Sequence, residues 1–154
     1  TGGQMIYGVL AIALAAVNYA VVPITALISH TDQTSGWSYG WDEIAAAIGF
    51  AQQGESIGFV AATDYALASP LAFALHDAGV TSLSPKRDAY DYWFDPEVHA
   101  GQNALIVADQ WRPLSDTVKA QFARVTEIRS LDIVRFGRAL DHYTIYLAQD
   151  FAPN

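Results

Sequence analysis

An uncharged apolar run near the start of the chain constrains this sequence more than any other feature. Residues 5–28 read MIYGVLAIALAAVNYAVVPITALI and contain no Asp, Glu, Lys or Arg. An α-helix rises about 1.5 Å per residue, so this run would measure roughly 35 Å, against about 30 Å for the hydrocarbon layer of a membrane. The run predicts a membrane-spanning helix over residues 5–29, followed by one polar domain over residues 30–154.

Two other interpretations of this run are weaker. A signal peptide begins with basic residues and has a shorter apolar core, whereas no Lys or Arg precedes this run. A buried core helix would be unusually long and apolar on all faces, although Asn18 and Pro23 reduce its hydrophobicity. A membrane span tolerates the proline, and small side chains allow other helices, including one from a second copy, to approach closely. These small residues are Gly8, Ala11, Ala15 and Ala16.

The charge distribution indicates on which side of the membrane the polar domain lies. No Lys or Arg occurs before Lys86, and cytoplasmic flanks of membrane helices usually carry an excess of both. We therefore expect the domain on the extracytoplasmic (periplasmic) side of the inner, or cell, membrane. The net charge of −8 disfavours nucleic acid as a partner. Residues 1–4 resemble part of an expression tag and are left out of the fold prediction.

The polar domain alternates between helical and extended patterns, which is typical of an α/β fold. Apolar residues at helical spacing predict helices over residues 41–53, 65–76 and 115–124. Short apolar runs predict buried strands over residues 56–62, 80–83 and 103–108, and alternation predicts two more over 126–136 and 139–149. The expected architecture is a small three-layer domain, in which a short parallel sheet is extended by a C-terminal antiparallel hairpin.

Two of the predicted buried strands are followed by aspartate, at Asp64 and Asp109. Ligand crevices in open α/β sheets form outside the carboxyl ends of the strands, so a ligand site is expected at this edge. In one interpretation, aromatic side chains stack on a sugar ring and an arginine holds a phosphate or carboxylate. In the other, which the lack of a recognisable site motif favours, the two aspartates cap turns and the aromatic residues fill a small core of their own. The candidate ligand-binding residues are Asp64, Tyr65, Arg87, Tyr90, Trp93, Asp109, Trp111 and Arg112.

Motifs for other chemistry are missing from the sequence. It has no cysteine, no glycine-rich phosphate loop and no nucleophile elbow, and its four histidines are not spaced as metal ligands. We therefore expect no cofactor and no metal. A small Mg²⁺-dependent phosphohydrolase that uses Asp64 and Asp109 is the weakest alternative, since neither strand ends in the usual D-x-D arrangement.

The order of the motifs resembles a known family. The apolar run is followed by GWDEIAAAI (residues 40–48), DYALASPLAFAL (64–75), KRxxYDYW (86–93) and GQNALIVAD (101–109). This order is similar to the C-terminal end of bacterial polytopic glycosyltransferases of clan C, of the dolichyl-phosphate-mannose mannosyltransferase and aminoarabinose transferase type. The resemblance covers nearly the whole chain.

The resemblance implies that the chain is the last membrane helix and the periplasmic α/β domain of such an enzyme. The implied reaction transfers a sugar from a polyprenyl-phosphate donor to an extracytoplasmic acceptor. The catalytic carboxylates of the family lie in the first outer loop of its membrane body, so no catalytic residue is carried over to this chain. The implied role is accessory, and the lipid-linked sugar would be met through the membrane body. The alternative is a membrane-anchored module that binds a sugar or a peptide through residues 90–93.

Overall fold

The computed structural model describes residues 2–22, 24 and 36–153, which divide into two compact units. The first unit combines the chain up to Gly40 with Asp132–Asp141, and the second combines Trp41–Leu131 with His142–Asn154. The sequence predicted one domain after the membrane span, whereas the contacts group the outer end of the C-terminal hairpin with the N-terminal part. Each unit is described by itself below.

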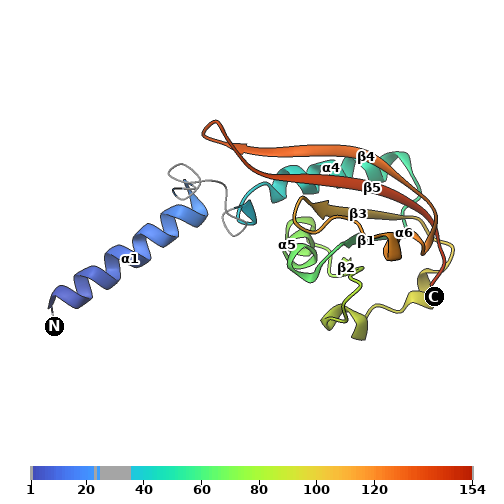
Figure 1. Ribbon diagram of the computed structural model, residues 1–154, viewed down its shortest axis with the longest axis horizontal. Coiled ribbons are helices and arrows are strands. Elements are labelled where there is room, and N and C mark those ends of the chain that lie inside the picture. The colour runs from blue at the N-terminus through green and yellow to red at the C-terminus, as the bar shows by residue number, and fades with distance from the viewer. Residues whose placement is uncertain (1, 23, 25–35, 154) are drawn as a thin grey trace. The chain divides into compact units, whose positions relative to one another are not determined.

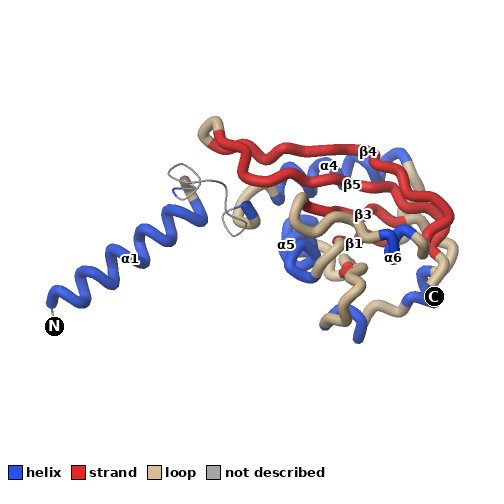
Figure 2. The backbone as a smooth tube through the Cα atoms, in the orientation of Figure 1, coloured by secondary structure: helices blue, strands red, loops and turns tan. Residues whose placement is uncertain are grey.

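The second unit is built on a five-stranded mixed sheet (Figures 1 and 2). The strand order is β2-β1-β3-β5-β4, with β1 (Phe59–Ala62) parallel to both β2 (Thr81–Ser82) and β3 (Ala104–Asp109). Strand β5 (Arg138–Phe151) runs antiparallel to β3 and continues the hairpin begun by β4 (Phe122–Arg135). All residues of β1 and β3 are buried, as expected of strands covered on both faces.

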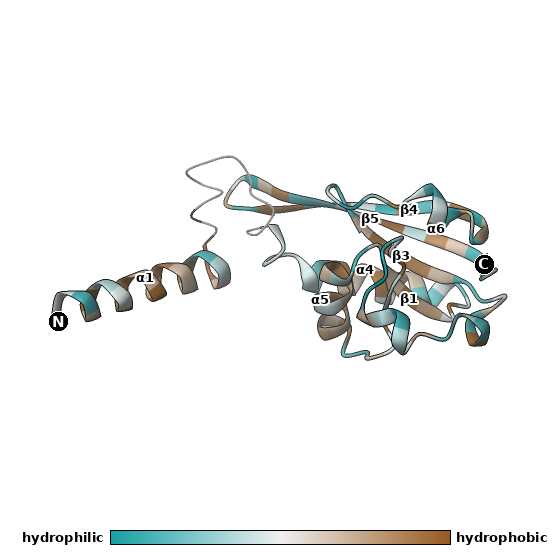
Figure 3. Cartoon of the chain, turned by 60° about the horizontal axis from the view of Figure 1, so that its bottom comes forward, coloured by the Kyte–Doolittle hydropathy of each residue, from teal (hydrophilic) through white to brown (hydrophobic). Residues whose placement is uncertain are grey.

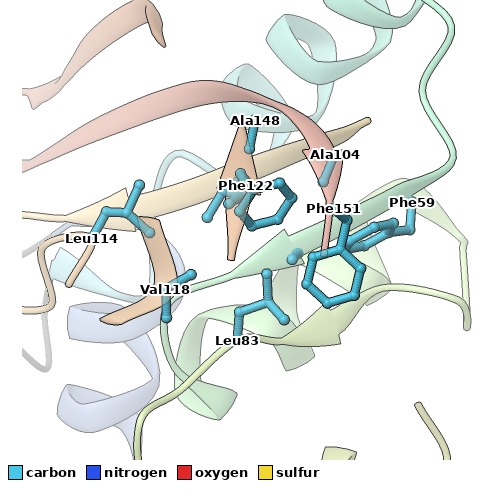
Figure 4. Packing of buried hydrophobic residues seen from close by; sticks show 10 residues of the cluster. Phe59, Leu83, Ala104, Leu114, Val118, Phe122, Ala148 and Phe151 are labelled. Atoms are coloured by element: carbon cyan, nitrogen blue, oxygen red, sulfur yellow. The ribbon is translucent and has the colours of Figure 1, made fainter. Parts of the chain in front are cut away.

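Helices cover the two faces of this sheet. Helix α4 (Trp41–Gly54) contributes Ala47, Phe50 and Ala51 to an apolar hollow that is also lined by Leu105 of β3, and α5 (Tyr65–Leu75) packs beside α4. The opposite face carries α6 (Asp116–Lys119) and a cluster of buried side chains drawn in Figure 4. That cluster comprises Phe59, Ala61, Leu83, Ala104, Ile106, Leu114, Val118, Phe122, Ala148 and Phe151.

The predicted fold class is therefore confirmed, including the short parallel core and the C-terminal hairpin. The helix predicted over residues 115–124 is wrong in its length, because α6 ends at Lys119 and Phe122 already belongs to β4, where it packs into the sheet cluster. Residues 84–96, which lie between two of the predicted strands, contain the 3₁₀-helix η1 (Ala89–Tyr92), and a second one, η2, follows at Pro96–His99. Asp88 begins η1 with a reciprocal capping box involving Asp91.

The first unit begins with α1 (Gly2–Ala20), which is long and apolar enough to cross a membrane. Figure 3 shows the apolar colouring along most of this helix, and only Asn18 is buried among its residues. The predicted span of residues 5–29 and α1 coincide over residues 5–20, and α1 also includes Gly2, Gly3 and Gln4. Residues 21 and 22 are no longer helical, which agrees with the bias of the residue before a proline against helical backbone. Pro23 and residues 25–29 of the predicted span lie outside the described residues.

Contacts within the first unit connect the end of α1 to the hairpin. The Tyr39 hydroxyl donates a hydrogen bond of 2.6 Å to the Asn18 carbonyl oxygen. Burial raises the pKa of the Tyr39 phenol above its usual 10.0, and the nearby positive charge of Arg135 opposes this shift. Gly40 has φ +92°, and a Cβ there would lie 2.5 Å from the Ile133 side chain, so the backbone of this segment lies directly against the hairpin.

Candidate functional site

The candidate site lies at the carboxyl ends of β1 and β3. This is the topological switch point of the sheet, because β2 and β3 are added on opposite sides of β1. From β1 the chain passes through α5 to β2 on one side, and β3 then pairs with the other side of β1. Such a switch point is the usual place for a crevice in an α/β sheet. Asp64 follows β1 by two residues and Asp109 is the last residue of β3, so both predicted carboxylates lie at this edge.

The Asp109 carboxylate is buried and fully used by its own turn. One oxygen, Oδ1, accepts hydrogen bonds from the backbone N–H groups of Trp111 and Arg112, and Oδ2 accepts a hydrogen bond of 2.8 Å from the Arg112 guanidinium. The side chain of Asp109 has no exposed surface. A buried carboxylate needs such partners, because an uncompensated charge in the interior is very costly.

Arg112 joins the two strand ends. Its Nε lies 3.2 Å from Oδ1 of Asp64, and the same Asp64 oxygen accepts a hydrogen bond from the Ala66 N–H at the start of α5. The Thr63 hydroxyl donates a hydrogen bond of 2.7 Å to the Arg112 carbonyl oxygen. The guanidinium is therefore held between two carboxylates, with 17% of its side chain exposed, and the predicted role of Arg112 as an anion ligand finds no support in this arrangement.

A shallow hollow of about 180 Å³ lies beside this ion-pair network. It is lined on one side by Thr63, Asp64 and Arg112, and on the other by Ser84, Pro85 and Lys86. The segment that follows β2 thus reaches the same edge as the two strand ends. The hollow combines hydroxyl groups with one ammonium group.

The predicted aromatic residues lie elsewhere, on η1 and around it. The Tyr90 hydroxyl lies 3.0 Å from the Ser69 hydroxyl of α5, and its ring meets Trp93 edge-on at 5.7 Å. Arg87 lies over the Tyr92 ring, with its guanidinium carbon 5.2 Å from the ring centroid, which is a cation–π contact. These contacts hold the segment to α5 and to itself, as the structural interpretation of the aromatic residues predicted.

Trp93 is 68% exposed and borders a second hollow of about 300 Å³ at the amino ends of β1 and β2. Phe59, His99 and Thr81 line the same hollow, and His99 stacks on Phe94 with 4.8 Å between ring centroids. Among the described residues, the buried Thr81 hydroxyl has no hydrogen-bond partner. This hollow therefore offers an aromatic face together with polar groups.

The structure brings together only part of the predicted set. Asp64, Asp109 and Arg112 form one group, whereas Trp93 borders the hollow at the opposite ends of the strands. The remaining aromatic candidates, Tyr65 and Trp111, are about half exposed. A single pocket in which Tyr90, Trp93 and Trp111 stack on one sugar ring is not found in the described part of the chain. The predicted pocket separates into two.

Four residues that contact these hollows or the aromatic segment were not predicted, namely Thr63, Lys86 and His99 in the hollows and Ser69 against Tyr90. Thr63 and Lys86 flank predicted site residues in the sequence, so adjacency to Asp64 and Arg87 was an available signal. His99 and Ser69 carry no such signal, because only the folded chain brings them to the aromatic segment.

Comparisons of this chain with protein-family models, with curated proteins and with solved structures find no match. The geometry also gives little support to the Mg²⁺ phosphohydrolase alternative. Both strand-end carboxylates face Arg112, and no group of three or more potential metal ligands occurs among the residues that the structure describes.

The Arg112 network predicts a large effect of one substitution on stability. Arg112→Met leaves the Asp109 charge buried without its guanidinium partner, so we expect the free energy of unfolding to fall by about 3 kcal/mol. Lys119→Met is the matched control, because it removes an ion pair in which the Asp116 side chain is 97% exposed, and such pairs contribute about 0–1 kcal/mol. Urea unfolding of both variants in detergent, followed by tryptophan fluorescence, measures the difference. Equal midpoints for the two variants would show that Arg112 has no bridging role.

Proposed function

We propose that this chain is the last membrane helix and extracytoplasmic α/β domain of a glycosyltransferase that uses a polyprenyl-phosphate sugar donor, with an accessory role. The observation that carries the membrane part is α1, an exposed apolar helix of 19 residues joined to the α/β fold. The enzyme class rests on the resemblance of four motifs that lie between residues 40 and 109. The domain would help to position the acceptor, cover the entrance to the active site or support the membrane body.

The candidate site supports an accessory role over a catalytic one. A glycosyl transfer that proceeds by general base catalysis needs a carboxylate that is free to take a proton from the acceptor. Asp64 and Asp109 instead bind backbone N–H groups and share the Arg112 guanidinium. Their geometry is that of two capped turns tied to each other, which suits a rigid scaffold.

This proposal predicts that the chain alone does not catalyse sugar transfer. Incubated in detergent or in vesicles with a polyprenyl-phosphate sugar and a range of extracytoplasmic acceptors, the chain should release no polyprenyl phosphate above the background without protein. Release of polyprenyl phosphate with saturation kinetics by this chain would contradict the accessory role.

A second candidate function, a membrane-anchored sugar- or peptide-binding module, is favoured by one specific observation. The hollow beside Trp93 is lined by an exposed indole ring, by the imidazole of His99 and by Thr81, whose buried hydroxyl has no partner among the described residues. Aromatic faces with a few polar groups are the usual composition of small-ligand sites. The hollow is open and shallow, so the expected affinity is modest.

Titration with soluble glycans while following tryptophan fluorescence tests this second function. A binding module should give a saturable change that is lost in Trp93→Ala and kept in Trp111→Ala, because Trp111 is also exposed but does not line the hollow. A flat response to glycans and peptides, or a response that both variants retain, would contradict it.

A further inference from the structure

The turn at the tip of the C-terminal hairpin places a phenylalanine, Phe136, in left-handed backbone conformation. Strand β4 ends at Arg135 and β5 begins at Arg138, so Phe136 and Gly137 form a two-residue turn with φ values of 51° and 73°. Two positive φ values are characteristic of a type I′ turn, for which Asn-Gly is strongly favoured. A bulky side chain with left-handed backbone is disfavoured, because its Cβ crowds the neighbouring carbonyl group.

Packing does not compensate for this strain. Phe136 is 63% exposed and Val134, two residues before it, is 48% exposed. An asparagine at the same position would relieve the turn and would expose less apolar surface. A strained, exposed phenylalanine therefore indicates a role outside the folding of the hairpin itself.

The tip lies close to the end of α1, within the same compact unit. The Tyr39 hydroxyl binds the Asn18 carbonyl near the last turn of α1, and Gly40, next to Tyr39, lies against Ile133 of the hairpin. A Cβ on Gly36 would lie 3.1 Å from the Leu140 carbonyl oxygen, on the other hairpin strand. Residues 36–40 thus connect both strands near the tip to the end of the apolar helix.

The tip also carries the positive charge of this part of the chain. Arg135 and Arg138 are the only Lys or Arg in residues 1–40 and 132–141 of the sequence, and they lie beside the turn, whereas the acids of the segment, Asp132 and Asp141, lie at its base. The chain as a whole has a net charge of −8. Two arginines beside an exposed phenylalanine offer an anionic membrane surface two charged partners and one apolar contact.

From these observations we propose that the hairpin tip binds the membrane interface, with Phe136 at the level of the headgroups and the two arginines on lipid phosphates. The inference rests on the proposed membrane span of α1, because a helix that crosses a bilayer places its end at the interface. Aromatic rings favour this layer, and arginine pairs well with phosphate. The occupant of the exposed apolar tip is thus a phospholipid surface.

The absence of cysteine in the chain allows a direct test. The chain with Ala139→Cys, an exposed position on the tip, is labelled with a nitrobenzoxadiazole fluorophore and reconstituted into vesicles of phosphatidylcholine with or without phosphatidylglycerol. Nitroxide lipids with the quencher close to the headgroup should quench the label, and its emission should shift to the blue. Val134→Cys provides a second label position on the other strand.

Phe136→Asn is the matched variant that separates lipid contact from folding. It should abolish the quenching and the blue shift. The midpoint of thermal unfolding of the chain should stay the same or rise, because Asn-Gly suits the turn. Phosphatidylglycerol should increase the quenching of the label. Arg138→Gln should reduce this increase about fivefold, as expected when one arginine is lost from an anionic surface.

Flotation of the chain with vesicles is measured in parallel. A chain that floats with the vesicles but shows no tip quenching at either label overturns this inference and leaves the proposed membrane span intact. Quenching that persists in Phe136→Asn also overturns it. A chain that does not float overturns both the span and the inference.

Discussion

The guanidinium of Arg112, held between Asp64 and Asp109, is the interaction on which the arrangement of the second unit depends. It connects the ends of the two adjacent parallel strands at the switch point of the sheet. The buried charge of Asp109 is tolerated because two backbone N–H groups and the guanidinium compensate it. The charged groups at this edge of the sheet therefore compensate one another. The groups that remain for a ligand are Lys86 and the serine hydroxyl groups beside this network, and Trp93 at the opposite ends of the strands.

The two units divide the work that the proposed function requires. The second unit has the rigid sheet and the hollows that could contact an acceptor. The first unit has the apolar helix and the hairpin tip, which are connected through residues 36–40. A helix alone leaves the domain free to rotate about its attachment. A second contact with the interface at Phe136 would restrict that rotation, and the proposed accessory role would benefit from a domain held in one orientation to the membrane.

Much of the fold could be predicted from local patterns. Residues 103–108 form a continuous apolar run and residues 65–76 have a capping aspartate, so β3 and α5 were recognisable within one or two residues. The extent of α6 and β4 was not, because Phe122 fits a helical pattern equally well and only the sheet cluster decides its conformation. The hairpin turn was predicted around Gly137 and Arg138 and is found one residue earlier, at Phe136-Gly137, because no local pattern favours phenylalanine at positive φ.

The candidate site shows the same limit of sequence-based prediction. The placement of Asp64 and Asp109 at one edge of the sheet could be predicted, because both follow buried strands. The ion pairs of Arg112 with both aspartates could not, because they depend on β1 and β3 being neighbours in the sheet.

The central claim is that α1 anchors this domain on the extracytoplasmic side of a membrane. Phe73 on α5 is 80% exposed, so a Phe73→Cys variant of this cysteine-free chain has a single reactive thiol on the domain surface. The most direct measurement is the labelling of this thiol by a membrane-impermeant maleimide in intact bacterial cells from which the outer membrane has been removed. The account predicts full labelling without lysis, on a protein that stays with the membrane after an alkaline wash. Labelling only after the membrane is disrupted, or release of the protein by the wash, would contradict it.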